Sequence, residues 1–137
     1  MSRTKEIYFH IGLPKTASTY LQRKVFPNFG NIQFVKKHKF RQHDKIIENG
    51  DSDVILLSSE WDVGKDFVNK KVIRFAEKYP DAKTIIVLRR HDKWLKSKYK
   101  YHIRKNGRLT FNEFFNLDDT GRMSVDELRF MSKIEFL

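Results

Sequence analysis

The 137-residue sequence contains no cysteine, which excludes disulfide bonds and thiolate metal ligands. It also contains no long hydrophobic run. The strand-like segment that follows Lys5 is too short for the apolar part of a secretory signal, and it is far too short to span a bilayer. We therefore expect a cytoplasmic protein with no membrane span.

Internal repeats, low-complexity tracts and interdomain linkers are absent as well. The chain is long enough to bury a core without disulfide or metal cross-links, and 39% of its residues are hydrophobic. We expect residues 1–137 to form a single α/β domain. Because the sequence ends on KIEFL, without a closing turn or a polar tail, we expect this domain to be incomplete at its C-terminus.

Acidic residues are too few to balance the basic ones, and the net charge is +11. The excess is local. Residues 89–108 hold nine Lys or Arg against one Asp, and residues 36–45 hold five against one. Such patches indicate an anionic partner: a phosphorylated cofactor, a polyanionic sugar, a nucleic acid or a membrane surface. A solvated face without a ligand is the alternative, and for residues 36–45 it is the default.

Strands and helices are predicted to alternate along the chain. Buried strands are predicted at 6–11, 54–58 and 84–88, and a short strand at 31–35. Helices are predicted at 18–26, around Ile46 and Ile47, and at 65–79, 91–106 and 111–116; a last helix begins at Ser124, with Glu127 completing a capping box. Strands that are apolar throughout and alternate with helices indicate a parallel sheet covered on both faces.

Small and hydroxyl-bearing residues follow the first predicted strand, in the segment GLPKTAST. A loop of small residues lets the backbone close around a phosphate, the next helix presents N–H groups, and Lys15 adds a positive charge. A polar turn with a Thr or Ser helix cap is the alternative. Pro14 stands where a Walker A loop needs glycine before its lysine, so the pattern is not that of a nucleotide triphosphatase.

A basic helix follows the 84–88 strand. Arg89 comes at the predicted strand end, and Ser97 lies eight residues later. Ser97 falls at the centre of a basic stripe that spans about 60° of the helix and includes Lys93, Lys100 and Arg104; Leu95, Tyr99 and Ile103 lie opposite and are predicted to pack against the sheet. The stripe suits a phosphate, and by itself it also fits an amphipathic helix with solvated lysines.

Together the two segments resemble a known family. GLPKTAST is similar to the 5′-phosphosulfate loop of sulfotransferases that use 3′-phosphoadenosine 5′-phosphosulfate (PAPS), and LRRHDKWLKSKY is similar to their 3′-phosphate motif. The resemblance covers roughly residues 6–105. It implies the P-loop-like, three-layer sulfotransferase fold, related to nucleotide kinases, and sulfuryl transfer from PAPS to a hydroxyl without a metal.

The resemblance also implies roles for individual residues. Lys15 would neutralise charge on the oxygen between sulfur and the 5′-phosphate. That phosphate would be held by Thr16, Ala17, Ser18 and Thr19, and the 3′-phosphate by Arg89 and Ser97. Ala17 departs from the glycine that is usual in the family, and His91 from a common proline. The region that would finish the sheet and cover the adenine is missing, so the resemblance predicts an N-terminal fragment.

The acceptor hydroxyl needs a base. Glu60, in SSEW after the 54–58 strand, is the carboxylate best placed for this role, and a salt-bridged or helix-capping glutamate is the alternative. His10 is expected in the core, and His91 is a weaker base candidate that would also suit a helix cap. The acceptor is hypothesised to be a carbohydrate hydroxyl, and the 36–45 patch would suit an anionic one.

Two other functions stay open. A P-loop phosphotransferase would need a GK[ST] loop and an Asp for Mg²⁺ at a strand end, and neither is seen. A nucleic-acid-binding module is suggested by VKKHKFRQHDK and by the Lys and Tyr residues of KWLKSKYKYH, whose rings could stack on bases. Against it, Tyr99 is assigned to the buried face of its helix.

Overall fold

The computed structural model describes residues 5–137. The chain divides into two compact units, Met1–Val87 and Leu88–Leu137, and each is described by itself. Within the described residues, no helix combines the length and the apolar character needed to cross a membrane.

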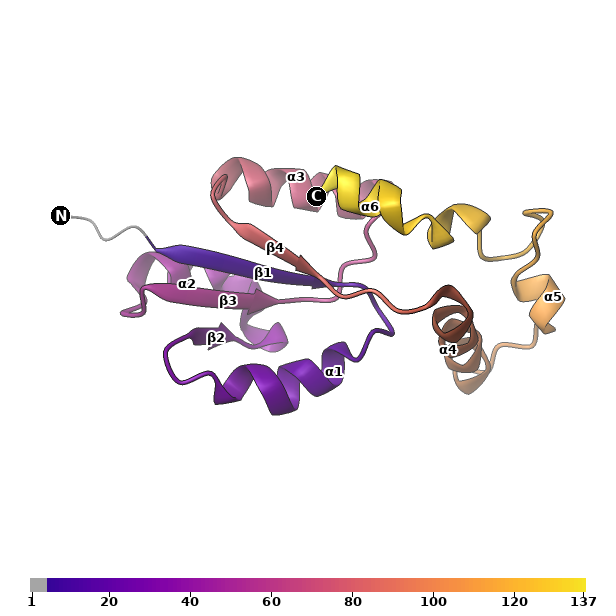
Figure 1. Ribbon diagram of the computed structural model, residues 1–137, viewed down its shortest axis with the longest axis horizontal. Helices are drawn as coiled ribbons and strands as arrows, with labels where there is room; N and C mark the ends of the chain where they lie inside the picture. Colours follow the sequence, from indigo (N-terminus) through magenta and orange to yellow (C-terminus); the bar gives the residue numbers. More distant parts are fainter. Residues whose placement is uncertain (1–4) are drawn as a thin grey trace. The chain divides into compact units, whose positions relative to one another are not determined.

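The first unit is built on a four-stranded sheet in which each strand is parallel to its neighbours (Figure 1). The strands are β1 Glu6–Gly12, β2 Gln33–Val35, β3 Val54–Ser58 and β4 Lys83–Ile86, in the order β2-β3-β1-β4. Helices flank this all-parallel sheet, which confirms the predicted α/β class.

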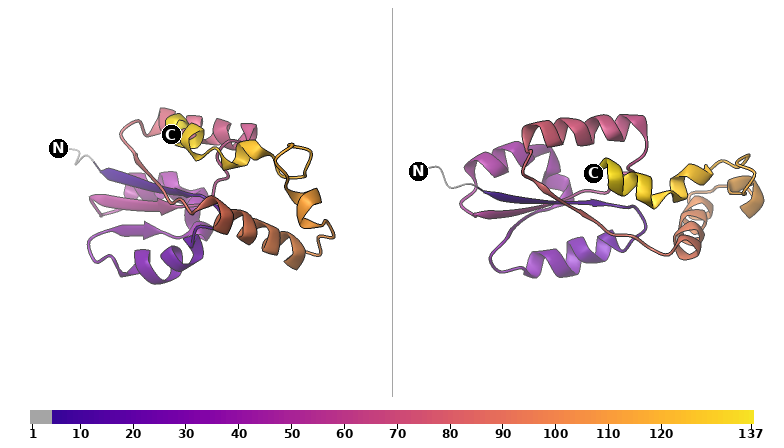
Figure 2. Two further views of the ribbon diagram at one scale, coloured as in Figure 1. Left: turned by 45° about the vertical axis from the view of Figure 1, so that its right-hand side comes forward. Right: turned by 45° about the horizontal axis from the view of Figure 1, so that its top comes forward.

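Helical segments make the connections between strands. They are α1 Ser18–Tyr20 with its continuations η1 Leu21–Val25 and η2 Phe26–Asn28, then η3 Lys37–Gln42 with α2 His43–Asn49, then α3 Asp66–Lys78. Right-handed crossovers that step in opposite directions along a sheet lie on opposite faces. Accordingly, α1 lies on one face and α2 and α3 on the other (Figure 2, right).

Phe9 on β1 anchors the core beneath α2 and α3. Its side chain is 2% exposed, and its ring centroid lies 4.8 Å from the rings of Trp61 and Phe75 and 5.4 Å from that of Phe40. Because successive strand residues point to opposite faces, the next residue, His10, faces the α1 side. The two faces of β1 therefore serve different purposes: one packs aromatic rings, and the other carries a polar side chain.

The fourth strand differs from its prediction. The sequence predicts a buried strand at 84–88, whereas β4 ends at Ile86 and lies at the edge of the sheet, with Ile85 36% exposed. Burial is wrongly predicted because an apolar run does not reveal whether a strand has neighbours on one side or two. Beyond β4, Val87 still exchanges backbone hydrogen bonds with Gly12 and Leu13, so Arg89 follows a short extended segment.

The second unit consists of helical segments. They are α4 His91–Arg104, α5 Phe111–Phe114, η4 Val125–Leu128 and α6 Phe130–Phe136. Trp94 of α4 is fully buried, and its ring meets that of Phe130 edge-on at 5.5 Å. The predicted apolar side of this helix is wrong at Ile103, which is 45% exposed. The deeply buried residue is instead Trp94, one position before Leu95, the first residue of the predicted apolar side.

The capping box predicted at Ser124 is also wrong. The Ser124 hydroxyl accepts the N–H of Asp126 at 3.1 Å, because the 3-10 turn that follows brings this group closest. Glu127 instead forms an ion pair with Lys98, 3.6 Å apart. A complete capping box occurs at the start of α5, where the side chains of Thr110 and Glu113 each accept the other residue's backbone N–H.

Candidate functional site

A tight loop connects β1 to α1 at the carboxyl end of the sheet. Gly12, Lys15 and Ala17 have φ angles of 122°, 68° and 63°, all in the region that L-residues rarely adopt. A Cβ on Gly12 would also lie 3.3 Å from the nitrogen of Pro14, so this position needs glycine. The left-handed conformation costs an L-residue such as Ala17 roughly 1–2 kcal/mol, a cost that glycine at this position would avoid.

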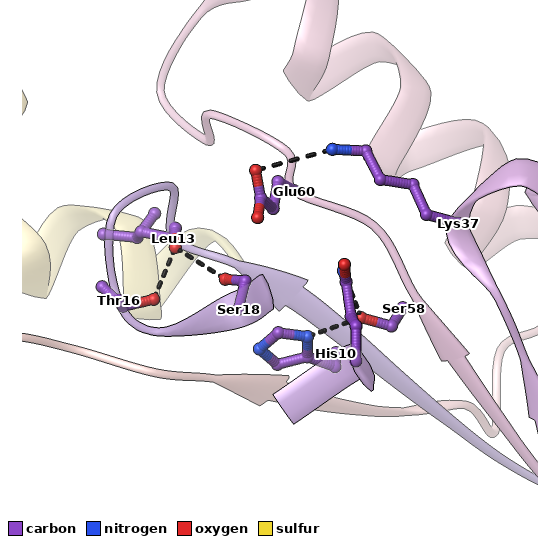
Figure 3. Close-up of polar contacts among 8 residues, drawn as sticks. His10, Leu13, Thr16, Ser18, Lys37, Ser58 and Glu60 are labelled. Carbon is purple, nitrogen blue, oxygen red and sulfur yellow. Dashed lines mark hydrogen bonds and ion pairs between the residues drawn. The ribbon is translucent and has the colours of Figure 1, made fainter. Parts of the chain in front are cut away.

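Two of the predicted hydroxyl ligands are used inside this loop. Thr16 Oγ1 donates a hydrogen bond to the carbonyl oxygen of Leu13 at 2.5 Å, and Ser18 Oγ donates to the same oxygen at 3.3 Å (Figure 3). Both side chains are buried, whereas Ala17 and Thr19 are exposed. The two buried hydroxyls therefore hold the loop closed, which leaves backbone N–H groups and the Thr19 side chain as donors toward a ligand.

The backbone at the start of α1 can supply those donors. The first N–H groups of a helix lack carbonyl partners within the helix. In the described part of the chain, the Leu21 N–H is the first of these groups that forms a hydrogen bond back to the loop: it donates to the Ala17 carbonyl oxygen at 3.1 Å. The N–H groups of Ala17, Ser18 and Thr19 precede it, in the loop that carries Lys15. An anion at this point would meet both N–H groups and a positive charge.

Glu60 lies beside the same loop. After β3 ends, the chain continues along β1, because Ser59 donates its N–H to the His10 carbonyl at 3.0 Å and Trp61 donates to that of Ile11 at 2.8 Å. The Glu60 carboxylate is 25% exposed and lies 3.5 Å from Lys37 Nζ. In Figure 3 it lies between Lys37 and the loop. Glu60 is thus ion-paired, as the alternative interpretation expected, and its role as a base stays a prediction.

A row of hydrogen-bonded polar side chains lies under the loop, on the α1 side of the sheet. His10 is 0% exposed, which confirms its predicted place in the core. Its Nδ1 lies 2.8 Å from Ser58 Oγ, and Gln22 Nε2 donates to that oxygen at 2.9 Å. Burial lowers the pKa of His10, and the negative charge of Glu60 opposes this only in part, so the ring is neutral near pH 7.

Sequence reasoning did not find Ser58 or Gln22. A signal existed for Ser58: it is the polar residue that ends the apolar VILLS run, and it stands opposite His10 in the β1–β3 register. Two polar residues at matched positions of neighbouring buried strands indicate a shared hydrogen bond. Gln22 carried no comparable signal, since its role depends on how α1 and η1 lie over the sheet.

The second predicted motif lies in the second unit. Arg89 is exposed in the segment before α4, and Ser97 is half-buried on the helix. Arg90 forms an ion pair with Asp92, Nε to Oδ1 2.6 Å, which lowers the pKa of Asp92 to about 2. His91 Nε2 donates a hydrogen bond to the Leu128 carbonyl oxygen, 2.8 Å away, so the side chain serves packing within this unit. That the two motifs bind one nucleotide stays a prediction.

Among residues 5–137, no group of three or more His, Asp or Glu side chains is arranged to hold a metal ion. Comparison of the chain with models of protein families, with curated proteins and with solved structures found no match.

Proposed function

We propose that the protein binds PAPS and transfers its sulfuryl group to an acceptor hydroxyl. The observation that carries the proposal is the loop at the carboxyl end of β1, which holds Lys15 and leads into the first N–H groups of α1, while the segment that carries Glu60 is hydrogen-bonded to the end of β1. Ligands of open parallel sheets bind at this edge. The finer fold assignment, a P-loop-like sulfotransferase, belongs to the same proposal.

The loop and the carboxylate supply complementary parts of the proposed reaction. The acceptor oxygen forms a bond to sulfur while the bond from sulfur to the 5′-phosphate oxygen breaks. The hydroxyl proton passes to Glu60, and the electron pair of the broken bond stays on the phosphate oxygen, so that adenosine 3′,5′-bisphosphate leaves. Lys15 stabilises the charge that develops on this oxygen. The rest of the catalysis is positioning of the reactants.

The nucleotide's other end is assigned to the second motif. In this proposal Arg89 binds the 3′-phosphate through its guanidinium group, and Ser97 donates a hydrogen bond to it from its hydroxyl. Arg90 is not assigned to it, because its guanidinium is already engaged with Asp92.

One tyrosine of α4 supports the nucleic-acid alternative, and another counts against it. Tyr101 on α4 is 46% exposed among basic residues, as base stacking would require. Tyr99 packs instead: its hydroxyl donates to the Leu109 carbonyl at 3.1 Å, and its ring lies 5.2 Å from that of Phe111.

Thermal unfolding with two ligands separates these functions. We expect adenosine 3′,5′-bisphosphate at micromolar concentration to raise the melting temperature, because a ligand that binds the folded state stabilises it, and adenosine to leave the temperature unchanged. A single-stranded oligonucleotide would act through its phosphates, and its effect would collapse as salt is added. Stabilisation by the oligonucleotide alone would exclude the proposed enzyme.

A further inference from the structure

A cavity of about 550 Å³ opens in the first unit, between the α1–η1–η2 segment and the chain that follows β2. Its walls include four basic side chains, Arg23, Lys36, Lys37 and His38, and the aromatic ring of Phe34. The volume is that of a small-molecule site. The cavity does not coincide with the loop that carries Lys15, so it is a separate place on the same unit.

The charge of the cavity wall is of one sign. Arg23, Lys36 and Lys37 carry positive charges, and no acidic side chain is among the lining residues. Lys37 is paired with Glu60, whereas for Arg23 and Lys36 no ion pair is recorded within the described part of the chain. Such a concave basic surface concentrates anions.

The cavity also offers apolar surface. Phe34 is half-buried in its wall, and its ring lies 5.4 Å from that of Phe26, which fixes it in place. A bare inorganic anion would leave this surface and most of the volume unused. A sugar ring has C–H faces that pack on an aromatic ring, and a carboxylate on the sugar would meet the cations.

Two contacts join the cavity to the candidate site. Lys37, in its wall, lies 3.5 Å from Glu60, the proposed base. Gln22, also in its wall, is held by its hydrogen bond to Ser58 at the end of β3. Lys37 therefore links the cavity wall to the carboxylate that, in the proposed reaction, takes the proton of the acceptor hydroxyl.

We propose that this cavity is the acceptor site and that it takes a carboxylate-bearing sugar, a hexuronate within an oligosaccharide. The identification of the ligand as an acceptor rests on the proposed sulfuryl transfer, whereas its binding does not. Arg23 and Lys36 bind the carboxylate, Phe34 packs on the sugar ring, and Lys37 orients Glu60 toward the hydroxyl.

Calorimetric titration of the whole chain with a galacturonate trisaccharide tests the proposal, with maltotriose as the neutral ligand. We expect the uronate to bind at least tenfold more tightly than maltotriose, and the double change Arg23→Gln and Lys36→Gln to weaken it at least tenfold. Arg23→Lys with Lys36→Arg, which keeps both charges, should retain most of the affinity. As a matched control, Lys70→Gln with Arg74→Gln removes two exposed charges from α3 and should change the affinity less than twofold.

The same samples separate this inference from the proposed function. If adenosine 3′,5′-bisphosphate raises the melting temperature but the uronate does not bind, the cavity assignment is overturned and the nucleotide site stands. If the uronate binds and the nucleotide does not raise the melting temperature, the nucleotide site is overturned and the cavity stands as a uronate site. Equal losses in both double variants, or tighter binding of an oligonucleotide that depends on Arg23 and Lys36, would also overturn the uronate assignment. Unchanged melting temperatures of the variants show that they are folded.

Discussion

Replacing Lys15 by alanine is expected to lower the rate of sulfuryl transfer from PAPS about 100- to 1,000-fold, the usual effect of removing one group that stabilises charge in a transition state. Lys15 lies in the loop between β1 and α1, where the backbone is already closed by the Thr16 and Ser18 hydroxyls. The change therefore removes a charge and leaves the hydrogen bonds of Thr16 and Ser18 in place. The measurement is transfer of labelled sulfate to a panel of glycans, lipids and phenols.

The division of this effect between binding and catalysis is informative. A lysine that acts on charge developing in the reaction should lower kcat more than it weakens PAPS binding. Lys24→Ala is the matched control, since it removes an exposed lysine from the helical segment that follows the loop, and it should leave kcat within threefold of the unaltered protein. A Lys15→Ala variant as active as this control would rule out the proposed role.

Replacing Phe9 by alanine is expected to lower the free energy of unfolding by about 3–5 kcal/mol, the usual cost of truncating a buried aromatic ring. Phe9 is 2% exposed and contacts rings from three distant parts of the chain, Phe40, Trp61 and Phe75. The cavity left behind would lie between the sheet and its helices. Urea denaturation followed by circular dichroism measures the change.

Phe67→Ala provides the comparison for Phe9. Phe67 is 62% exposed on α3, so its truncation should change the free energy of unfolding by less than about 0.5 kcal/mol. Because Trp61 packs on Phe9 and adjoins Glu60, loss of the Phe9 ring should also make the segment that carries Glu60, the proposed base, more mobile. A loss below 1 kcal/mol at Phe9 would mean that the aromatic cluster is not the centre of the core.

Much of the fold was predictable because its signals are local. The runs that became β1 and β3 are apolar and bounded by turn residues, and α3 carries apolar residues at helical spacing. The exposure of β4 was not predictable, because it depends on which strands lie beside it. The capping box failed at Ser124 for a related reason: a sequence pattern shows which partners are possible, and the local turn decides which one is close.

Part of the candidate site was likewise predictable from the sequence, and part was not. The position of Lys15 and Glu60 at strand ends follows from the alternation of strands and helices, and the structure places both at one edge of the sheet. The inward turn of the Thr16 and Ser18 hydroxyls could not be predicted, because it depends on the positive φ of Lys15 and Ala17. The basic cavity was visible only as a charged run at 36–45; its walls come from segments on both sides of β2.

The central claim is that Lys15 and Arg89 bind opposite phosphates of one nucleotide. Titrations of the Lys15→Ala and Arg89→Ala variants with adenosine 3′,5′-bisphosphate, adenosine 5′-monophosphate and adenosine 3′-monophosphate test it most directly. Lys15→Ala should weaken the bisphosphate and the 5′-monophosphate at least tenfold and leave the 3′-monophosphate unchanged, and Arg89→Ala should do the reverse. If each change weakens both monophosphates alike, or neither, the two residues do not serve separate phosphates and the claim is wrong.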